Sequence, residues 1–582
     1  MNILTDYIVT EENNIFDKYV KDTSPKNQVK LKEQLLVYVI SPTQENIDNI
    51  CYAYTLSNSP TKNIDFSLIF IPGETSEIIK SMMKMEILKN YDIYNFSIEI
   101  MPIDHDLLSL ELENSFKEIY INKNNSPILK LADVVLKLEV AFGKISNTYI
   151  KGDYAKIFND ILTLKEEEHN LKSQDKILGM IVLDRSVDFI TPLLSNYTYE
   201  GLIDDIFGIK NGEIKVKQSK VIANFGNKKK QNITDKEIMY SLTSNNNTFF
   251  RNLRCMNFIT ANNRIADITN SYKKNMEQES GFGGSKDMLS TVTGWRDYTF
   301  AKAYLNANTY FIDLILNKLT EEPIRDKRRR EISLLKGIAQ LNSELFYDDC
   351  LIAKKDLDYI LDLMILESLT QNGLNNYTNI KRDILNIYGY QNIFLLRNLE
   401  SLGFLKEKEK SLIKLFKSKH QIISEKLNLN NMDDFRPSES DCLEYVGNGY
   451  CPISLKLVQK CGEGSWGEIR DTLQEIPGAT VFPDNEEEIR SPDEPLNTIF
   501  LVFVGGITYT EIEGVRYLNR KYKQIFDKSN DPNKTRKQFI IVTTQILNSK
   551  KLYNSLGMNY KSNYTIKQFS DDIDGKTKTK KK

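Results

Sequence analysis

The stretch VLDRSVDFITPLLSNYTYEGLIDDIFGI, residues 182–209, joins an apolar strand to a cluster of charged residues and two helix-like turns. The strand begins in ILGMIVLD (177–184), and such an unbroken apolar run is typical of a strand buried on both faces of a parallel sheet. Two later runs, NTIFLVFVGG (497–506) and QFIIVTTQI (538–546), have the same character, and an amphipathic segment, 508–526, lies between them. Because strand, helix and strand in this order form a parallel crossover unit, we predict that all three runs belong to one α/β sheet.

The remaining patterns extend this prediction to the whole chain. The runs QLLVYVI (34–40) and FSLIFIP (66–72) indicate a separate α/β unit. No proline occurs between Pro192 and Pro323, which permits long helices in the middle of the chain. We therefore predict an α/β plus α fold with three domains: α/β domain one at 1–130, a discontinuous α/β domain two at 131–210 and 490–582, and a mainly helical domain three at 211–489 inserted into the second.

Within the inserted domain, two long helix-like segments flank a glycine-rich turn. The segments are 252–279 and 286–318, and GFGGS (281–285) lies between them. Glycines end helices readily because they adopt left-handed backbone angles. The pattern therefore predicts an αα-hairpin at about 252–318.

Composition and charge argue against several classes of protein. Lys and Arg number 77 against 79 Asp and Glu, a net charge of −2, whereas a nucleic-acid-binding protein needs a dominant cationic face. The six cysteines form no CxxC pair and there are three histidines, so we predict no metal site. Few cysteines in a long chain suit a reducing compartment. No apolar run approaches ~18 residues and no secretory signal is visible, so we expect no transmembrane segment.

The strand-end acid Asp184 raises the question of catalysis. A phosphohydrolase would place a nucleophilic Asp at this position with a second acid two residues later, but residue 186 is serine and the second acid is Asp188. The structural interpretation is that Asp184 and Arg185 form an ion pair that braces the strand end, with Thr191 and Pro192 starting the next turn. We favour the structural interpretation and predict that the chain is not an enzyme.

Two glycine motifs and one basic run also have structural alternatives. GEGSWG (462–467) follows a helix-like segment instead of the strand that a dinucleotide site requires, so a helix-to-helix turn is favoured. Gly505-Gly506 lies between a strand and a helix, but Glu511 and Glu513 discourage a phosphate there, so we predict no cofactor. The run RDKRRR (325–330) is compatible with a nuclear signal or an anionic-lipid patch, and a solvated helix face is favoured over both.

Six stretches in order give the chain a family resemblance. LDRSVDFITPLLSNYTYEGLIDDIFGI resembles a signature of the Sec/Munc (SM) family of SNARE-binding proteins. The other five stretches are EIMPIDHDLLSLELENSFKEIY (99–120), RDILNIYGYQNIFLLRNLESLGFL (382–405), YVGNGYCPISLKLVQ (445–459), SWGEIRDTLQEIPG (465–478) and FLVFVGGITYTEIEGVRYL (500–518). The resemblance covers nearly the whole chain and is greatest to the vacuolar subtype of the family.

The resemblance implies a fold, an activity and partners. The expected fold is an arch of three domains, two of them α/β, with the helical domain inserted into the second. The expected role is to bind SNARE helices of Qa and R type and to template their assembly for membrane fusion, without catalysis. The vacuolar subtype acts within HOPS and CORVET tethers, docked on a vacuolar protein sorting sixteen-like subunit. It is therefore expected in the cytoplasm, peripheral on late endosome, lysosome or vacuole membranes.

The resemblance also implies roles for particular residues. Signature residues are expected to hold domain two against the helical domain: Asp184, Arg185, Asp188, Pro192, Tyr199, Glu200, Gly201 and Asp204. Residues on the solvent faces of the hairpin are expected to contact SNAREs: Asn263, Arg264, Asn270, Lys273, Lys274, Arg296, Tyr304 and Asn308. The alternative for the second set is that these side chains are merely solvated.

Two expectations concern departures from the family. The first domain of the family begins with a strand before QLLVYVI (34–40), so we expect domain one to be shortened at its N-terminus. A tether scaffold that docks its partner subunit without SNARE templating is the alternative function.

Overall fold

The structure is a computed structural model. It describes residues 34–40, 46–47, 64–70, 79–80, 82–83, 91–96, 99–169, 177–217, 237–243, 248–280, 305–338, 343–408, 417–433, 435–436, 442–483, 496–528 and 536–557. The chain divides into two compact units, Met1–Met101 and Pro102–Lys582.

The first unit contains a small parallel sheet. Its strands β1 (Gln34–Ile40), β2 (Ile64–Phe70) and β3 (Tyr91–Asn95) lie in the order β1-β2-β3. All pairings are parallel, and Leu68 and Phe70 of the central strand are fully buried. The two strands predicted from apolar runs are therefore confirmed.

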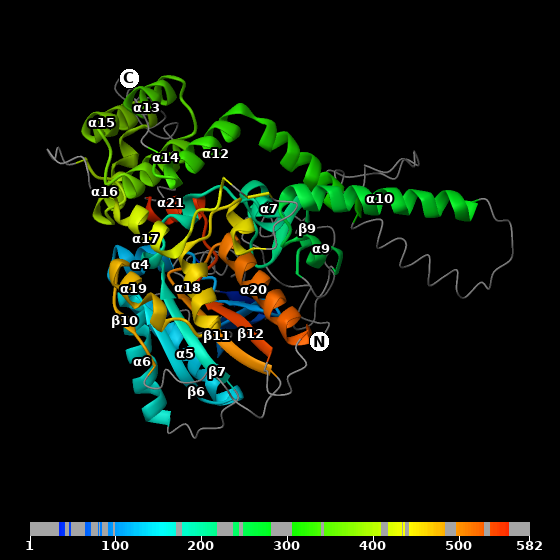
Figure 1. Cartoon of the computed structure of the whole chain (residues 1–582). Helices are drawn as coiled ribbons and strands as arrows, with labels where there is room; N and C mark the ends of the chain where they lie inside the picture. Colours follow the sequence, from blue (N-terminus) through cyan, green and yellow to red (C-terminus); the bar gives the residue numbers. More distant parts are fainter. Residues whose placement is uncertain are drawn as a thin grey trace, which may run out of the picture. The chain divides into compact units, whose positions relative to one another are not determined.

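The second unit is built on a seven-stranded sheet whose core joins distant parts of the chain. β7 (Ile177–Asp184) pairs in parallel with β6 (Ile145–Lys151) on one side and β11 (Leu496–Val504) on the other, and β11 pairs in parallel with β12 (Arg536–Thr543). The two central strands, β7 and β11, are mostly apolar and buried. Helices flank the sheet (Figure 1). The predicted sharing of one sheet by 177–184, 497–506 and 538–546 is confirmed.

Both edges of this sheet come from segments that the domain prediction placed elsewhere. The order is β10-β6-β7-β11-β12-β5-β4, in which β4 (Met101–Asp104) and β5 (Leu107–Ser109) lie beyond β12. The compact unit accordingly begins at Pro102, not after residue 130 as predicted. β10 (Thr480–Val481), which follows the helical region, pairs antiparallel with β6 at the other edge. Edge strands this short carry little pattern, because periodicity needs several residues to appear.

Helices that cover the sheet arise where apolar residues recur at helical spacing. α5 (Ser126–Phe142) packs against α6 (Asp153–His169), and α20 (Tyr509–Lys528) packs against β12. α20 buries Ile512, Val515 and Leu518, as the amphipathic segment 508–526 predicts.

The inserted region is mainly helical, as predicted, apart from a two-stranded antiparallel sheet of β8 (Glu213–Lys217) and β9 (Glu237–Ser241). Its described α-helices beyond residue 321 are α12 (Glu322–Leu335), α13 (Ser343–Ile352), α14 (Leu357–Thr370), α15 (Tyr377–Tyr388), α16 (Ile393–Ser401), α17 (Lys419–Leu427), α18 (Ile453–Gly462) and α19 (Arg470–Glu475). The helix α21 (Ser549–Leu556), which follows β12, packs against α14 and α16, so this segment returns to the helical region. The predicted fold class, α/β with parallel sheets plus a large helical part, is confirmed. Among the described residues, no helix is both long enough and apolar enough to cross a bilayer.

The basic run of α12 differs from the predicted solvated face. Arg325 and Arg329 are exposed, but Lys327 bonds to buried Asp362 at 2.7 Å. The guanidinium of Arg328 lies 4.5 Å from the ring centroid of Tyr197, and that of Arg330 lies 3.4 Å from the ring centroid of Phe346. The prediction is wrong for these three cations, because acids and aromatic rings from distant segments bind them.

Candidate functional site

Asp184, at the end of β7, caps a helix. Its side chain is fully buried, and its oxygens accept from the backbone N–H groups of Tyr154 (2.8 Å), in the first turn of α6, and Ser186 (2.8 Å). Gly152 lies so close that a Cβ there would collide with this carboxylate. Burial raises the pKa of Asp184, while the backbone donors oppose that rise. A carboxylate enclosed in this way braces the strand end and has no free approach for a substrate.

Arg185 forms a bidentate ion pair with Glu511 of α20. The two N–O distances are 2.7 and 2.8 Å, and both side chains are fully buried. Glu511 also accepts from the backbone N–H of Thr508 while the Thr508 hydroxyl accepts from the N–H of Glu511, which is a capping box at the start of α20. The predicted ion pair between Arg185 and Asp184 is wrong, because Arg185 pairs with Glu511 instead. Glu511 lies 326 residues away in sequence, so no local pattern indicated this partner.

Asp188 ties the signature to the helical region. Its carboxylate accepts from the N–H of Thr191 (2.9 Å), from the Thr191 hydroxyl (2.6 Å) and from the N–H of Ile453 (3.0 Å), the first residue of α18. Pro192 follows in the short 3-10 helix Thr191–Leu193 and is buried. This acid therefore holds its own turn and the N-terminus of α18 together, a bond that joins sheet and helices.

The second half of the signature lies on α7 (Tyr199–Phe207) and is also packed tightly. A Cβ added to Gly201 would lie 2.7 Å from side-chain atoms of Asn196, so only glycine fits. Asp204 accepts from the N–H of Ile209 (2.8 Å) and from the side-chain amide of Asn548 (2.7 Å), just before α21. These contacts agree with a scaffold role for the signature.

Glu200 belongs to a larger group of buried charges, which we call the charge network: Arg516, Arg254, Asp104, Asp106, Glu200 and Glu513. Arg516 of α20 bonds to Glu200 (2.6 Å), Glu513 (2.7 Å) and Asp106 (3.1 Å), and Arg254 bonds to Asp104. Burial opposes ionisation of Glu513, but the Arg516 guanidinium lowers its pKa to about 2. Burial raises the pKa of the neighbouring Glu200, Arg516 opposes that rise, and the adjacent Glu513 adds to it.

Part of this network has the composition of a metal site. Asp104, His105 and Asp106 place possible ligand atoms within 4.8 Å of one another. The carboxylates of Asp104 and Asp106 already face the guanidinium groups of Arg254 and Arg516, which would repel a cation. These residues therefore fit an ion-pair network better than a metal.

The structure describes the first helix of the predicted hairpin and the base of the second. α10 (Phe258–Ser280) and the helix at 305–320 together are called the helical arm here. α10 buries Ala261 and Ile265 in the core and extends away from the neighbouring helices (Figure 1). The structure places Asn263, Arg264 and Asn270 on the exposed side of α10.

The other predicted SNARE-facing residues differ in their outcome. Lys273 and Lys274 belong to α10, but their side chains are outside the described residues, as are Arg296 and Tyr304 altogether. Asn308 is fully buried and accepts a hydrogen bond from the Tyr199 hydroxyl at 2.8 Å. Its predicted place on a solvent face is wrong, because the rotation of a helix about its axis depends on packing that the sequence of one helix does not reveal.

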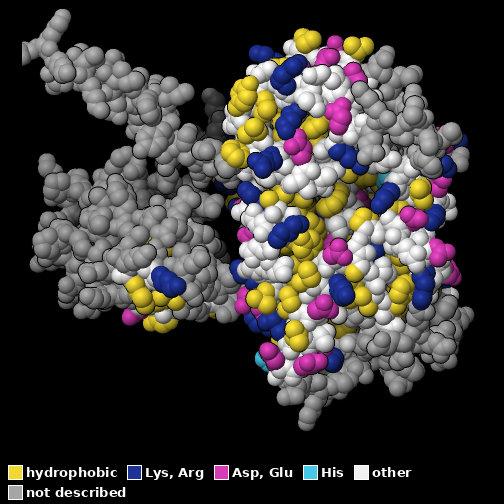
Figure 2. Space-filling view, turned by 90° about the vertical axis from the view of Figure 1, so that its left-hand side faces the viewer, with side chains coloured by type: hydrophobic (Ala, Val, Ile, Leu, Met, Phe, Trp, Pro, Cys, Tyr) yellow, Lys and Arg dark blue, Asp and Glu magenta, His cyan; other side chains and the backbone are white. Residues whose placement is uncertain are grey.

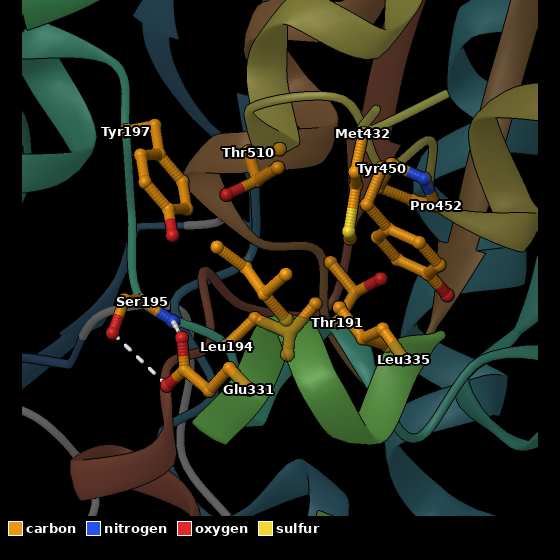
Figure 3. Close-up of a pocket in the computed structure, with 12 residues that line it drawn as sticks. Thr191, Leu194, Ser195, Tyr197, Glu331, Leu335, Met432, Tyr450, Pro452 and Thr510 are labelled. Atoms are coloured by element: carbon orange, nitrogen blue, oxygen red, sulfur yellow. Dashed lines mark hydrogen bonds between the residues drawn. The ribbon is translucent and has the colours of Figure 1, made fainter. Parts of the chain in front are cut away.

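A small pocket lies where the signature meets the helical region (Figure 3). It encloses about 360 Å³ including its open mouth, and Glu331 on one side accepts from the backbone N–H (3.3 Å) and the hydroxyl (3.0 Å) of Ser195. Its lining is Thr191, Leu194, Ser195, Tyr197, Glu331, Ile332, Leu335, Met432, Gly447, Tyr450, Pro452 and Thr510. Because five separate segments build it, no local pattern predicts it.

The signature residues were found from sequence, but most of their partners were not. Asp106 and Arg516 lie in two of the family-like stretches, 99–120 and 500–518, but nothing in the sequence paired them with each other or with the signature. They meet, together with Arg254, because α20, β4–β5 and the base of the arm pack together. One signal was available for Glu511, since Thr508 and Glu511 have the spacing of a capping box.

Comparison with known proteins places this arrangement in a family. The Sec1 family profile matches residues 2–555. Vacuolar protein sorting-associated protein 33A of Rattus norvegicus is 27% identical over 532 residues, which is 88% of this chain and 85% of the relative. The vacuolar protein-sorting-associated protein 33 homolog of Arabidopsis thaliana is 27% identical over 512 residues, 83% of this chain and 80% of the relative.

Solved structures agree in fold. The SM protein Vps45 in complex with the Qa SNARE Tlg2 has a TM-score of 0.54 at 14% identity, covering 91% of this chain and 88% of that one. The Unc18–syntaxin 1 complex from Monosiga brevicollis has a TM-score of 0.51 at 14% identity, covering 91% and 89%. With a family profile that spans nearly its whole length, the chain belongs to the Sec1 family of SM proteins.

Proposed function

We propose that this protein binds SNARE helices of Qa and R type along the helical arm and templates their assembly for membrane fusion. The proposal includes its site of action, on late endosome, lysosome or vacuole membranes, as a peripheral subunit of a HOPS- or CORVET-type tether. Membership of the Sec1 family and similarity to vacuolar sorting proteins support it. Two similar structures are complexes with a Qa SNARE or syntaxin 1, which supports the partner class.

The physical basis is the high cost of starting a helix. An isolated SNARE segment must fix several residues before its first hydrogen bond forms, so nucleation is unfavourable. A preformed helix that offers a continuous side receives an amphipathic segment in helical form. Two SNARE segments held side by side then need less ordering before they zipper. This raises the fraction of SNARE segments that is in a conformation able to assemble.

The observation that carries the proposal is that α10 has one buried side and one exposed polar side. Its inward residues Ala261 and Ile265 are buried, whereas Asn263, Arg264 and Asn270 are exposed on a helix that extends beyond the body (Figure 1). Such a helix displays a polar track about 1.5 Å long per residue and remains anchored at its base.

The first prediction changes only this exposed track. The double variant Asn263→Glu and Asn270→Glu adds two negative charges without touching the core, and should weaken capture of fluorescent Qa and R SNARE segments about tenfold or more, measured as Kd by anisotropy. The matched control is Asn122→Glu with Asn554→Glu, two exposed asparagines outside the arm. Equal Kd values for the two double variants would contradict binding along α10.

We also propose that no bond is made or broken in this role. Asp184, the strand-end acid of a possible phosphohydrolase, is fully buried and bonded to backbone N–H groups. Phosphatase activity that disappears on Asp184→Asn would oppose this view.

A separate surface supports docking to a tether subunit. The docking patch comprises Ile352 of α13, Ile387 of α15, Tyr390 between α15 and α16, and Ile393 and Phe394 of α16. Their exposures run from 37% for Ile387 to 79% for Ile352, unusual for large apolar side chains. Figure 2 faces the side on which these helices lie and shows hydrophobic side chains gathered on its upper part.

The occupant that we propose is the vacuolar protein sorting sixteen-like tether subunit. An aromatic anchor with aliphatic neighbours is the usual core of a protein interface. The Lys381–Glu400 pair links α15 to α16, the two helices that carry most of the patch. The alternative function, a scaffold that docks its partner without SNARE templating, would use this patch alone.

The second prediction tests the patch. Ile352→Asp with Tyr390→Asp should weaken binding of the purified tether subunit at least about tenfold and leave SNARE capture unchanged. Val140→Asp with Leu164→Asp is the control, because Val140 on α5 and Leu164 on α6 are each 62% exposed and lie outside the patch. Undiminished tether binding by the patch variant would show that the subunit docks elsewhere. Tether binding without any SNARE capture by the wild type would favour the scaffold alternative.

A further inference from the structure

A buried hydrogen bond lies at the base of the helical arm. The hydroxyl of Tyr199, the first residue of α7, donates to the side-chain oxygen of Asn308 at 2.8 Å, and both residues have no exposed surface. Apolar side chains surround the pair, with the Phe250 ring 6.0 Å from that of Tyr199 and Phe311 in the same cluster. Asn308 lies on the second helix of the arm, at 305–320.

The same short segment also holds the start of the first helix. The N–H of Tyr199 donates to the carbonyl of Met256 (3.0 Å), and the N–H of Phe258 donates to the carbonyl of Tyr197 (3.0 Å). Phe258 is the first residue of α10. Residues 197–199 therefore contact α10 through their backbone and the second helix through one side chain.

A polar pair in an apolar surrounding selects one register. If the helix at 305–320 slid or rotated by one residue, the buried Tyr199 hydroxyl would lose Asn308 as its hydrogen-bond acceptor. Leaving buried polar groups unpaired is unfavourable, whereas the apolar contacts around them tolerate small shifts. The bond thus discriminates between arrangements that hydrophobic packing alone would leave close in energy.

We propose that Tyr199 and Asn308 are positioning residues that set the register between the two helices of the arm and thereby its capture of SNARE segments. This inference rests on the proposed function and adds a role for residues that never touch the SNARE. Two segments assemble in register only when the surface that receives them keeps a fixed geometry. An arm that samples several registers presents the competent one for less of the time, and the apparent Kd rises in proportion.

The test removes one hydroxyl. Tyr199→Phe keeps the ring and deletes the bond, and Asn308→Leu deletes it from the other side. Tyr347→Phe is the matched control, because the Tyr347 hydroxyl donates to Glu367 at 2.8 Å in an equally buried place between α13 and α14. Full-length proteins are compared by hydrogen exchange of 258–271 and 305–320, by Kd for fluorescent Qa and R SNARE segments, and by Kd for the tether subunit.

We expect both arm variants to exchange faster in these two segments, and to bind SNARE segments about tenfold more weakly while binding the tether subunit unchanged. Tyr347→Phe should leave the arm and SNARE capture as in the wild type. Exchange unchanged in both arm variants would overturn the positioning role, and so would faster exchange with undiminished SNARE capture. If the wild type captures no SNARE segment, the proposed function fails, and the hydrogen exchange alone then decides whether the bond sets the register.

Discussion

Replacing Arg516 by methionine should lower the free energy of unfolding by about 3–5 kcal/mol. Arg516 is 4% exposed and bonds to Glu200, Glu513 and Asp106, which come from three different parts of the chain. Methionine fills much of the same volume but carries no charge, so the loss is dominated by acids left buried without a cation. Urea unfolding followed by circular dichroism and by fluorescence of the buried Trp466 measures the effect.

Two further variants sharpen this prediction. Arg329→Met removes an arginine that is 66% exposed and pairs with Glu322 on the surface of α12, and should change stability by less than about 1 kcal/mol. Adding Glu513→Gln to Arg516→Met removes one of the stranded charges and should recover part of the lost stability. If Arg516→Met lowered the free energy of unfolding no more than Arg329→Met, the charge network would not stabilise the folded protein.

The second large effect concerns pH and Glu139. This residue, in the last turn of α5, is 2% exposed, and its carboxylate accepts from the N–H of Ile145 at 3.0 Å. Burial raises its pKa from 4.5 to about 7, and the nearby Glu166 carboxylate adds to the rise. Between these values the unfolded chain releases a proton that the folded chain keeps, so stability falls as pH rises. The contribution is fully present below pH 4.5 and is lost as pH rises through about 7.

Glutamine at this position should remove the contribution of Glu139 to the pH dependence of stability. Glu139→Gln stays neutral at every pH, so at pH 8 it should be more stable than the wild type by about 3 kcal/mol, with the difference shrinking toward pH 5. Urea midpoints at pH 5, 6, 7 and 8 measure it, with Glu168→Gln, an exposed glutamate of α6, as the control. Parallel midpoint curves for the wild type and Glu139→Gln would show that this carboxyl is ionised throughout.

The signature illustrates how far sequence reasoning reached. Its residues were assigned a scaffold role from their resemblance to the family, and the contacts of Asp188 and Asp204 agree with that role. The particular bonds differ, since Arg185 pairs with Glu511 instead of the adjacent Asp184. Sequence neighbours were favoured because nearness along the chain is the only nearness that a single sequence displays.

The arm shows the same limit in another form. The helix-like pattern places 305–320 in a helix, but the outward side was chosen wrongly for Asn308. A polar residue is expected outside, and here a buried tyrosine hydroxyl satisfies it. The same reason explains Lys327 and Arg328 in α12, which were expected in solvent and contact Asp362 and Tyr197.

The sequence by itself determined five apolar strands, the crossover helix α20, the helical insertion and the family, because apolar periodicity and ordered motifs are properties of the linear chain. Only the tertiary structure decided which charges meet in the charge network, where the second unit begins, which side of the arm faces outward and where an apolar patch stays uncovered. Each of these depends on contacts between segments far apart in sequence, and burial in such contacts sets the energy of every charge and hydroxyl involved.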